Sequence, residues 1–272
     1  MSRLEVGGGK SNLNTGHLKR YRIAVPPLHE QRAIAEVLSD ADAIIEYLER
    51  LIAKKRLLKK GVMQQSLTGK KRLPGFAEEW EVKRLDTVAD IDPDNLGSGT
   101  PLDYAFKYIS LEDVDVGSLR NYSEQIFSSA PSRARRRLKA GDILVSTVRP
   151  NLQSHLLFVS TEPNWVCSTG FSVVRCKNQV ADPHYIFQNL FSHHVAKQIE
   201  ALLTGSNYPA INGRDVKALE IPMPKLPEQT AIASILSAMD AEIALLEAQL
   251  AKYRQLKQGL MQKLLTGRIR LI

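Results

Sequence analysis

The scarcity of some residue types excludes several kinds of site and fold. It contains only two cysteines, Cys167 and Cys176, too few for a disulfide framework or a four-cysteine zinc site. No apolar stretch approaches the roughly 18 residues that span a bilayer. The first residues also lack the apolar core of a signal peptide. With 43% hydrophobic and 24% charged residues, the chain is expected to be globular, cytoplasmic and free of membrane contact.

Motifs of nucleotide and methyl-group chemistry are also missing. The sequence has no G-x-x-x-x-G-K-[ST] phosphate loop, and the glycines before Lys10 follow no predicted strand. The segment 92–95 (DPDN) is not the Asn-Pro-Pro-aromatic loop of DNA methyltransferases. His193 and His194 fall on a predicted helix, where they would point about 100° apart and make poor joint metal ligands. We therefore expect no catalytic residue, no metal site and no bound cofactor.

The net charge indicates the kind of partner. The chain carries +8 at pH 7 with a pI near 9.4, which favours a polyanion because neutralised phosphates release counterions. Residues 71–225 are neutral overall. A nucleic-acid contact in this segment therefore requires a local basic cluster.

A repeat at a constant offset of 198 residues organises the chain. One copy begins at Leu28 and the other at Leu226, and they align over about 45 residues without a gap. The period is too long for a solenoid, so two copies of one unit are expected to flank a different domain. Weaker matches upstream, such as Lys19 with Lys217, predict that residues 1–25 are the end of a second domain of the kind that precedes Leu226.

Each copy of the repeat predicts one long helix. Prolines mark the start of both helices, and Gly69 and Gly267 occupy the expected C-cap positions. The front half of the first helix is acidic and its back half is basic. This order favours an antiparallel pair, although the charges could also simply face solvent. The predicted seam between the helices consists of Ile34, Leu38, Ile45, Leu48, Ile52, Ile232, Leu236, Met239, Ile243, Leu246, Leu250 and Tyr253.

The segment between the helices mixes strand and helix patterns. Runs such as GDILVSTV and FSVVRC predict strands, and residues 182–203 predict one helix with Asp182 as its N-cap. The fold class is therefore α+β, with one mixed domain and two long helices that form an antiparallel, coiled-coil-like spacer. The expected organisation is a remnant domain end (1–25), a spacer helix (26–70), the mixed domain (71–225) and a second spacer helix (226–272).

Five sequence blocks resemble the specificity subunits of type I restriction-modification enzymes. They are GFAEEWEVKRLDTVA (75–89), YISLEDV (108–114), GDILVSTVRP (141–150), STGFSVVR (168–175) and the segment 202–236. The resemblance implies that residues 71–225 are a target-recognition domain for double-stranded DNA. It also implies that the helices dock modification subunits and, through the complex, restriction subunits. S-adenosylmethionine, ATP and magnesium are then expected only in those partners. Full-length members resemble two recognition domains in alternation with two helices, whereas only one complete domain is present here.

Three groups of residues are candidates for DNA contact. The first is the basic run over residues 133–139, which offers phosphate contacts unless it is a solvated turn. Arginine pairs with guanine, and asparagine or glutamine with adenine, so a polar segment after a strand offers base contacts. The third group comes from the resemblance. In order, the groups are Arg133, Arg135, Arg136, Arg137 and Lys139; Arg149, Asn151 and Gln153; and Ser206, Asn207 and Tyr208.

The preferred interpretation is a DNA-recognition and scaffold subunit without catalytic activity. Because one domain reads one half-site, two copies are expected to associate through the spacer helices and read an interrupted inverted repeat. Three alternatives stay open: a non-functional fragment of a two-domain subunit, a nucleic-acid enzyme that acts alone, and a coiled-coil adaptor with no role at DNA.

Overall fold

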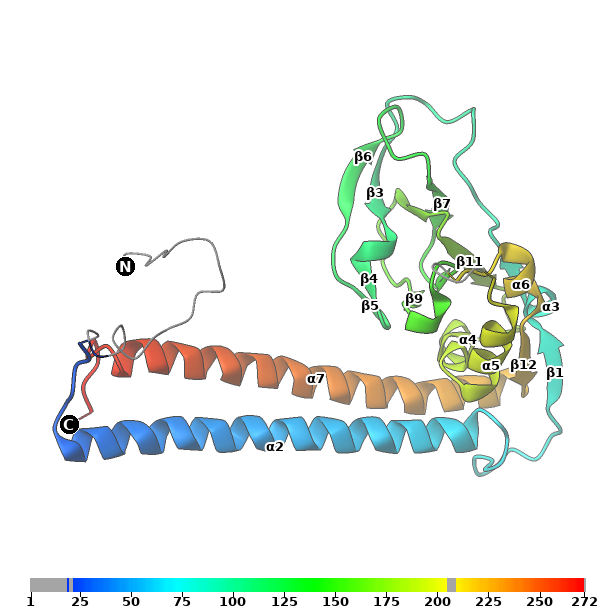
Figure 1. Ribbon diagram of the computed structural model, residues 1–272. Coiled ribbons are helices and arrows are strands. Elements are labelled where there is room, and N and C mark those ends of the chain that lie inside the picture. Colours follow the sequence, from blue (N-terminus) through cyan, green and yellow to red (C-terminus); the bar gives the residue numbers. More distant parts are fainter. Residues whose placement is uncertain (1–18, 20–21, 205–208, 272) are drawn as a thin grey trace. The chain divides into compact units, whose positions relative to one another are not determined.

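The computed structural model describes residues 19, 22–204 and 209–271. The chain divides into two compact units, one of residues 1–54 with 244–272 and one of residues 55–243. Each unit contains part of the long helices α2 (Leu28–Ser66) and α7 (Leu226–Leu264), which are labelled in Figure 1. The second unit also contains strands and short helices over residues 81–223, which we call the mixed lobe. The domain boundaries predicted from the sequence, at residues 25, 70 and 225, stay predictions.

The two long helices have the length and the ends that the repeat predicts. Each has 39 residues. Gly69 and Gly267 follow the last turns with φ of +70° and +69°, which confirms their predicted role as C-cap glycines. Neither these helices nor any other helix among the described residues is apolar over enough length to cross a bilayer.

Ion pairs within each unit establish that α2 and α7 run antiparallel. In the second unit, Lys55 and Lys59 from the basic half of α2 lie 2.6 Å and 2.5 Å from Glu242 and Asp240 of α7. In the first unit, the carboxylate of Glu49 lies 2.6 Å from Arg254. The acidic half of each helix therefore faces the basic half of the other, which confirms the predicted orientation.

Twelve short strands lie in the described part of the mixed lobe. In chain order they are β1 (Glu81–Arg84), β2 (Ala89–Ile91), β3 (Ala105–Ile109), β4 (Val114–Asp115), β5 (Ser118–Leu119), β6 (Ser123–Ile126), β7 (Ala134–Leu138), β8 (Ile143–Ser146), β9 (Leu156–Leu157), β10 (Trp165–Ser168), β11 (Phe171–Cys176) and β12 (Glu220–Met223). Two four-stranded sheets have the orders β6-β3-β10-β7 and β2-β11-β8-β9, and β1-β12 and β4-β5 form two-stranded ribbons. Only β3 and β10 pair in parallel among the described strands.

Short helices connect these strands. They are α3 (Leu85–Val88), η1 (Leu111–Asp113), η2 (Pro150–Leu152), α4 (Pro183–Leu190), α5 (His193–Leu202) and α6 (Gly213–Ala218). Asp182 caps α4 by accepting a hydrogen bond from the amide of Tyr185, as predicted. The prediction of one helix over residues 182–203 was wrong. Ser192 accepts a hydrogen bond from the amide of Val195, so it starts a second helix and ends the first.

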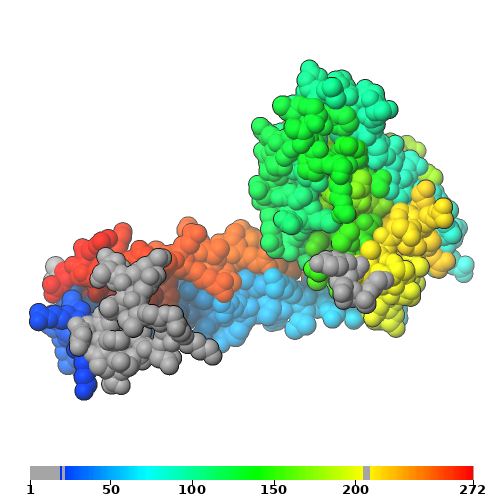
Figure 2. Space-filling model, turned by 45° about the horizontal axis from the view of Figure 1, so that its top comes forward, coloured from blue at the N-terminus to red at the C-terminus, as the bar shows by residue number. Residues whose placement is uncertain are grey.

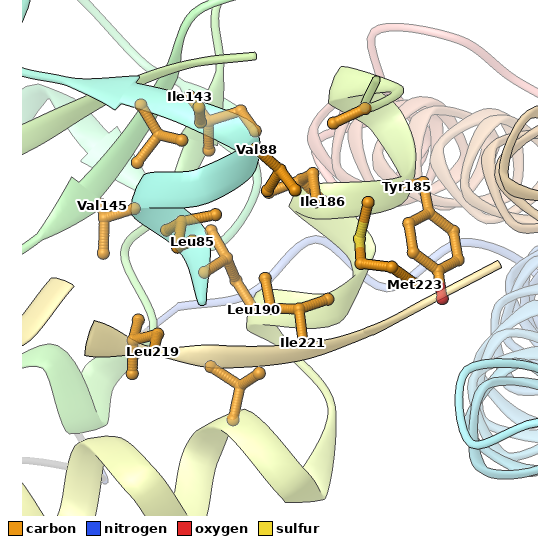
Figure 3. Packing of buried hydrophobic residues seen from close by; sticks show 14 of the residues in the cluster. Leu85, Val88, Ile143, Val145, Tyr185, Ile186, Leu190, Leu219, Ile221 and Met223 are labelled. Carbon is orange, nitrogen blue, oxygen red and sulfur yellow. The ribbon is translucent and has the colours of Figure 1, made fainter. Parts of the chain in front are cut away.

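The principal apolar core of the second unit joins the lobe to the adjoining ends of the long helices. Figure 3 shows Leu85 and Val88 of α3 packed with Leu190 of α4 and Ile221 of β12. The same cluster includes Leu236 of α7, which is fully buried. The lobe is therefore anchored to α2 and α7 by a continuous core.

Candidate functional site

The predicted basic run lies on and beside β7, at the edge of one four-stranded sheet. Arg133 precedes the strand and Lys139 follows it, and both are exposed. The three arginines between them, 135–137, are half-buried. The two ends of the run are therefore exposed to solvent, and its three central residues are half-buried.

The central arginines already have partners inside the lobe. Arg136 lies 2.9 Å from the carboxylate of Asp92, and their side chains are only 19% and 17% exposed. Arg135 lies over the ring of Phe127 at 5.0 Å, and Arg137 lies over that of Tyr104 at 5.3 Å. These contacts favour an internal role for the three guanidinium groups over phosphate binding.

Asp92 connects the two four-stranded sheets. It follows β2 and accepts hydrogen bonds from Ser172 Oγ (3.1 Å) and the amide of Val173 (2.7 Å) on β11. The ion pair with Arg136 then reaches the other sheet. Since a half-buried carboxylate is costly without partners, this pair stabilises the packing of the sheets.

A second ion pair, between Arg175 and Asp142, also lies within the lobe. Asp142, 1% exposed, accepts two hydrogen bonds from Arg175, at 2.8 Å and 2.7 Å. The same carboxylate accepts from the backbone amide of Lys139. The hydrogen bonds to Asp142 raise the pKa of Arg175, so the guanidinium stays charged and fixed in place.

The second group of predicted DNA contacts surrounds η2, directly after β8. Arg149 and Gln153 flank this single turn, and both adopt left-handed backbone conformations with φ of +49° and +54°. Pro150 is buried, whereas Arg149 and Asn151 are exposed and Gln153 is half-buried. The structure thus brings the three predicted residues together on one turn.

A buried histidine follows this turn in the chain. His155 is fully buried, and its Nδ1 accepts a hydrogen bond of 3.1 Å from the amide of Ser146 at the end of β8. Burial lowers the pKa of His155 to about 4, so the ring is neutral at physiological pH. Because Nδ1 accepts, the proton lies on Nε2, which has no partner among the described residues.

The third predicted group, Ser206, Asn207 and Tyr208, lies outside the described residues. The segment that follows it runs beside the η2 turn, since the carbonyl of Pro209 accepts a hydrogen bond of 2.8 Å from the amide of Arg149. Ala210 also forms a bridge with Val148.

Sequence reasoning missed two exposed cations on α6. Arg214 and Lys217 line a hollow of about 610 Å³ together with Asp92 and Asn212. Figure 2 shows the yellow surface around α6 adjoining the green surface of the strands. The only signal in the sequence was the match of Lys217 with Lys19 across the repeat, which carried no chemistry by itself.

The twelve residues of the predicted helix seam are all buried or half-buried. Those near the start of α7, such as Ile232 and Leu236, pack into the core of the lobe. Ala41, also buried, lies on α2 and was not predicted.

The repeat extends to the ion pairs between the helices. Arg72 pairs with Glu228 at 2.7 Å, and Arg270 pairs with Glu30 at 2.6 Å. Each residue of the first pair lies 198 positions from one residue of the second. The pairs of Lys59 with Asp240 and of Lys257 with Asp42 are related in the same way. Both ends of the helix pair therefore carry the same set of contacts.

The first unit has an apolar cavity at its end of the helix pair. The cavity of about 550 Å³ is lined by side chains from the start of α2, the end of α7 and the segments beside them. Five of its residues, Ile23, Ile34, Ala35, Leu38 and Arg270, correspond at the repeat offset to Ile221, Ile232, Ala233, Leu236 and Arg72. The first four counterparts belong to the core that anchors the lobe. The cavity is therefore lined by counterparts of the residues through which the long helices and β12 hold the lobe in the second unit.

Metal-binding and thiol chemistry have little support in the described residues. Within them, no group of three or more histidine, cysteine, aspartate or glutamate side chains is placed to hold a metal ion. Burial raises the pKa of the Cys167 thiol and raises that of Cys176 to about 12. Both thiols are therefore protonated and poor nucleophiles at physiological pH.

Comparison with known proteins gives one consistent family. The model of the type I restriction modification DNA specificity domain matches residues 1–54 and 77–253. The MjaVIII specificity subunit of a type I restriction enzyme from Methanocaldococcus jannaschii is 28% identical, over 97% of this chain and 66% of that protein. The putative MjaX specificity subunit of the same organism is 29% identical, over 96% of this chain and 62% of that protein.

Solved structures agree with this result. The HsdS subunit from Thermoanaerobacter tengcongensis is 28% identical with a TM-score of 0.57, over 72% of this chain and 50% of that one. The S subunit of a type I system from M. genitalium is 16% identical with a TM-score of 0.59, over 88% and 61%, and shows the fold alone. The chain thus spans between half and two thirds of the length of these relatives.

Proposed function

Because this chain belongs to the type I restriction-modification DNA specificity family, we propose that it is the DNA-recognition and scaffold component of such a complex. The mixed lobe binds one half of a bipartite target in double-stranded DNA. The helices α2 and α7 form a spacer on which modification subunits, and through them restriction subunits, assemble. The observation that carries this proposal is the repeated helix: equivalent ion pairs join α2 to α7 in both units, and one lobe packs on the end of α2 and the start of α7.

A second recognition lobe completes the proposed target site. The apolar cavity beside Ile34 and Leu38 offers the same helix residues that anchor the mixed lobe at the other end of the pair. Exposed apolar surface of this kind is typical of an interface. The second lobe occupies this cavity, as part of a longer chain or as part of another one.

The homodimer through the spacer helices that the sequence predicts requires an exchange of helices between two copies. Within one chain, α2 and α7 already bury each other's seam residues, such as Leu48 and Leu250. Two copies that use the same seam must therefore exchange helices. Light scattering at several concentrations measures this association, and a monomer throughout would remove the homodimer.

The partners supply the chemistry of the complex. In the proposal this chain contributes geometry and no catalytic group. S-adenosylmethionine binds the modification subunits, and ATP and magnesium act with the restriction subunits. The assembly works in the cytoplasm, where the DNA lies.

Co-expression with the host's modification subunit tests the proposal. We expect a stable complex that methylates one bipartite motif, which sequencing of the modified bases identifies in the host genome. Affinity for a duplex that carries the motif should fall steeply with salt, because phosphate contacts release counterions.

Three outcomes separate the alternatives. A complex that forms but neither binds DNA in a salt-dependent manner nor methylates it indicates an adaptor. Failure to bind any modification subunit indicates a non-functional fragment. Methylation or cleavage by the purified chain alone would show an independent enzyme.

A further inference from the structure

The η2 turn keeps long polar side chains at two strained backbone positions. Arg149 (φ +49°, ψ +51°) and Gln153 (φ +54°, ψ +30°) both lie in the left-handed region, which L side chains rarely adopt. Glycine would relieve the strain at either position. Strain of this kind persists where the surrounding structure imposes it, and it is concentrated at functional sites. The turn is therefore a candidate for a role beyond connecting β8 to β9.

Hydrogen bonds hold the turn in one conformation. The carbonyls of Arg149 and Pro150 accept from the amides of Leu152 (3.0 Å) and Gln153 (2.9 Å). The amide of His155 donates to the carbonyl of Gln153 at 2.7 Å. Pro150, the first residue of the turn, and His155, two residues after Gln153, are both buried. A side chain at the tip is thus presented without the entropy cost of ordering a loose loop.

At the tip of this turn the exposed residues Asn151 and Leu152 carry no charge, and the exposed Arg149 lies at the start of the turn. Asn151 is exposed, and its amide makes no hydrogen bond with the part of the chain that the structure describes. Its neighbour Leu152 is 57% exposed. An amide beside a methyl-bearing side chain matches the edges of bases, which offer hydrogen-bonding groups and the thymine methyl.

We propose that the Arg149–Gln153 turn is the base-reading element of the mixed lobe. The side-chain amide of Asn151 pairs with the N6 and N7 edge of an adenine in the major groove, and Leu152 contacts a neighbouring thymine methyl. The inference rests on the proposed function, because it names the residues that deliver the specificity of the half-site. The half-buried arginines of β7 contact Asp92, Phe127 and Tyr104 within the lobe, which favours the turn over them for this role.

Selection from a randomised DNA library tests this assignment. The full chain, assembled with the host's modification subunit, selects duplexes with randomised centres, and the bound pool is sequenced. Four proteins are compared: the unchanged chain, Asn151→Ala, Asn151→Asp and the control Asn178→Ala, an exposed asparagine on the turn after β11. Melting temperature and complex assembly are measured for each.

The expected result is a change at one position of the motif. Asn151→Ala reduces the preference for one adenine by roughly 5- to 150-fold, the equivalent of one lost bidentate pair, and leaves the other positions unchanged. Asn151→Asp has the same effect, since a carboxylate is repelled by N7. The slope of affinity against salt stays the same, because no charge that binds phosphate is lost. Asn178→Ala selects the original motif.

Two results would overturn the assignment. The first is an unchanged motif with both Asn151 variants, and the second is loss of folding with both, which would make the residue structural. Neither result affects the proposed function, which fails if the unchanged chain forms no complex with the modification subunit or if that complex selects no motif. Gln153→Gly gives an independent check, because it should keep the melting temperature while discrimination at the half-site declines.

Discussion

Acidification between about pH 7.5 and pH 5 should destabilise the lobe through one histidine, His155. Its ring is fully buried, and burial lowers its pKa from 6.5 to about 4. In the unfolded chain the ring binds a proton near pH 6.5, whereas in the folded lobe it stays neutral down to about pH 4. Protonation therefore favours the unfolded state in this interval, and the free energy of unfolding declines as the pH declines through it.

The size of the effect follows from the two pKa values. At pH 5 the unfolded ring is almost fully protonated and the folded ring almost fully neutral. The proton linkage then lowers the free energy of unfolding by about 2 kcal/mol relative to pH 7.5. Carboxylates in the same lobe also contribute to the pH dependence. A variant that removes only the imidazole is needed to isolate its share.

Urea titrations at pH 7.5 and pH 5 make this comparison. His155→Asn retains an acceptor for the amide of Ser146 but does not titrate, so its stability should change less between the two pH values, by about 2 kcal/mol. His184→Gln, at an exposed position, should behave like the unchanged chain. If His155→Asn and the unchanged chain lose the same stability on acidification, the ring is already accessible to protons and the reasoning fails.

Three further predictions concern packing and reactivity. Arg136→Ala should lower the free energy of unfolding by about 1–3 kcal/mol, because it removes the charged partner of the half-buried Asp92 carboxylate. The salt dependence of DNA binding should stay unchanged, and a flatter salt slope would place the arginine on phosphate. Leu236→Ala should lower the free energy of unfolding by about 2–5 kcal/mol. The counterpart Leu38→Ala should lower it clearly less in the isolated chain, because Leu38 is less buried. Equal losses of stability in urea titrations would contradict this difference in burial. Cys167 and Cys176 should react with a thiol reagent at pH 8 only after unfolding, and fast reaction in the native state would disprove their protection.

The sequence predicted the long helices well because their signals are local and repeated. Apolar spacing, prolines at the helix starts and the glycines at 69 and 267 all indicate the same elements. Polarised charge was enough to orient the pair. Each of these features acts within a few helical turns, or compares one copy with the other, and needs no knowledge of the lobe.

The lobe was less predictable because its contacts join distant segments. The basic run suggested a phosphate site, yet Arg136 lies beside Asp92, far away in sequence, and this contact decides which way the guanidinium points. Likewise, Ser192 looked like an ordinary helix residue until its hydroxyl was seen to accept from the amide of Val195. The polar segment after β8 was identified from the sequence, but its strained turn depends on backbone angles that no composition reveals.

The crossed ion pairs limit how the spacer can change length. Four residues inserted into α2 alone would advance everything beyond them by about 6 Å and would separate Lys59 from Asp240 or Asp42 from Lys257. A matching insertion in α7 would restore both pairs. Elongation of one helix therefore has to be accompanied by elongation of the other. Under the proposed function, the gap between two half-sites would then change only when both helices lengthen together.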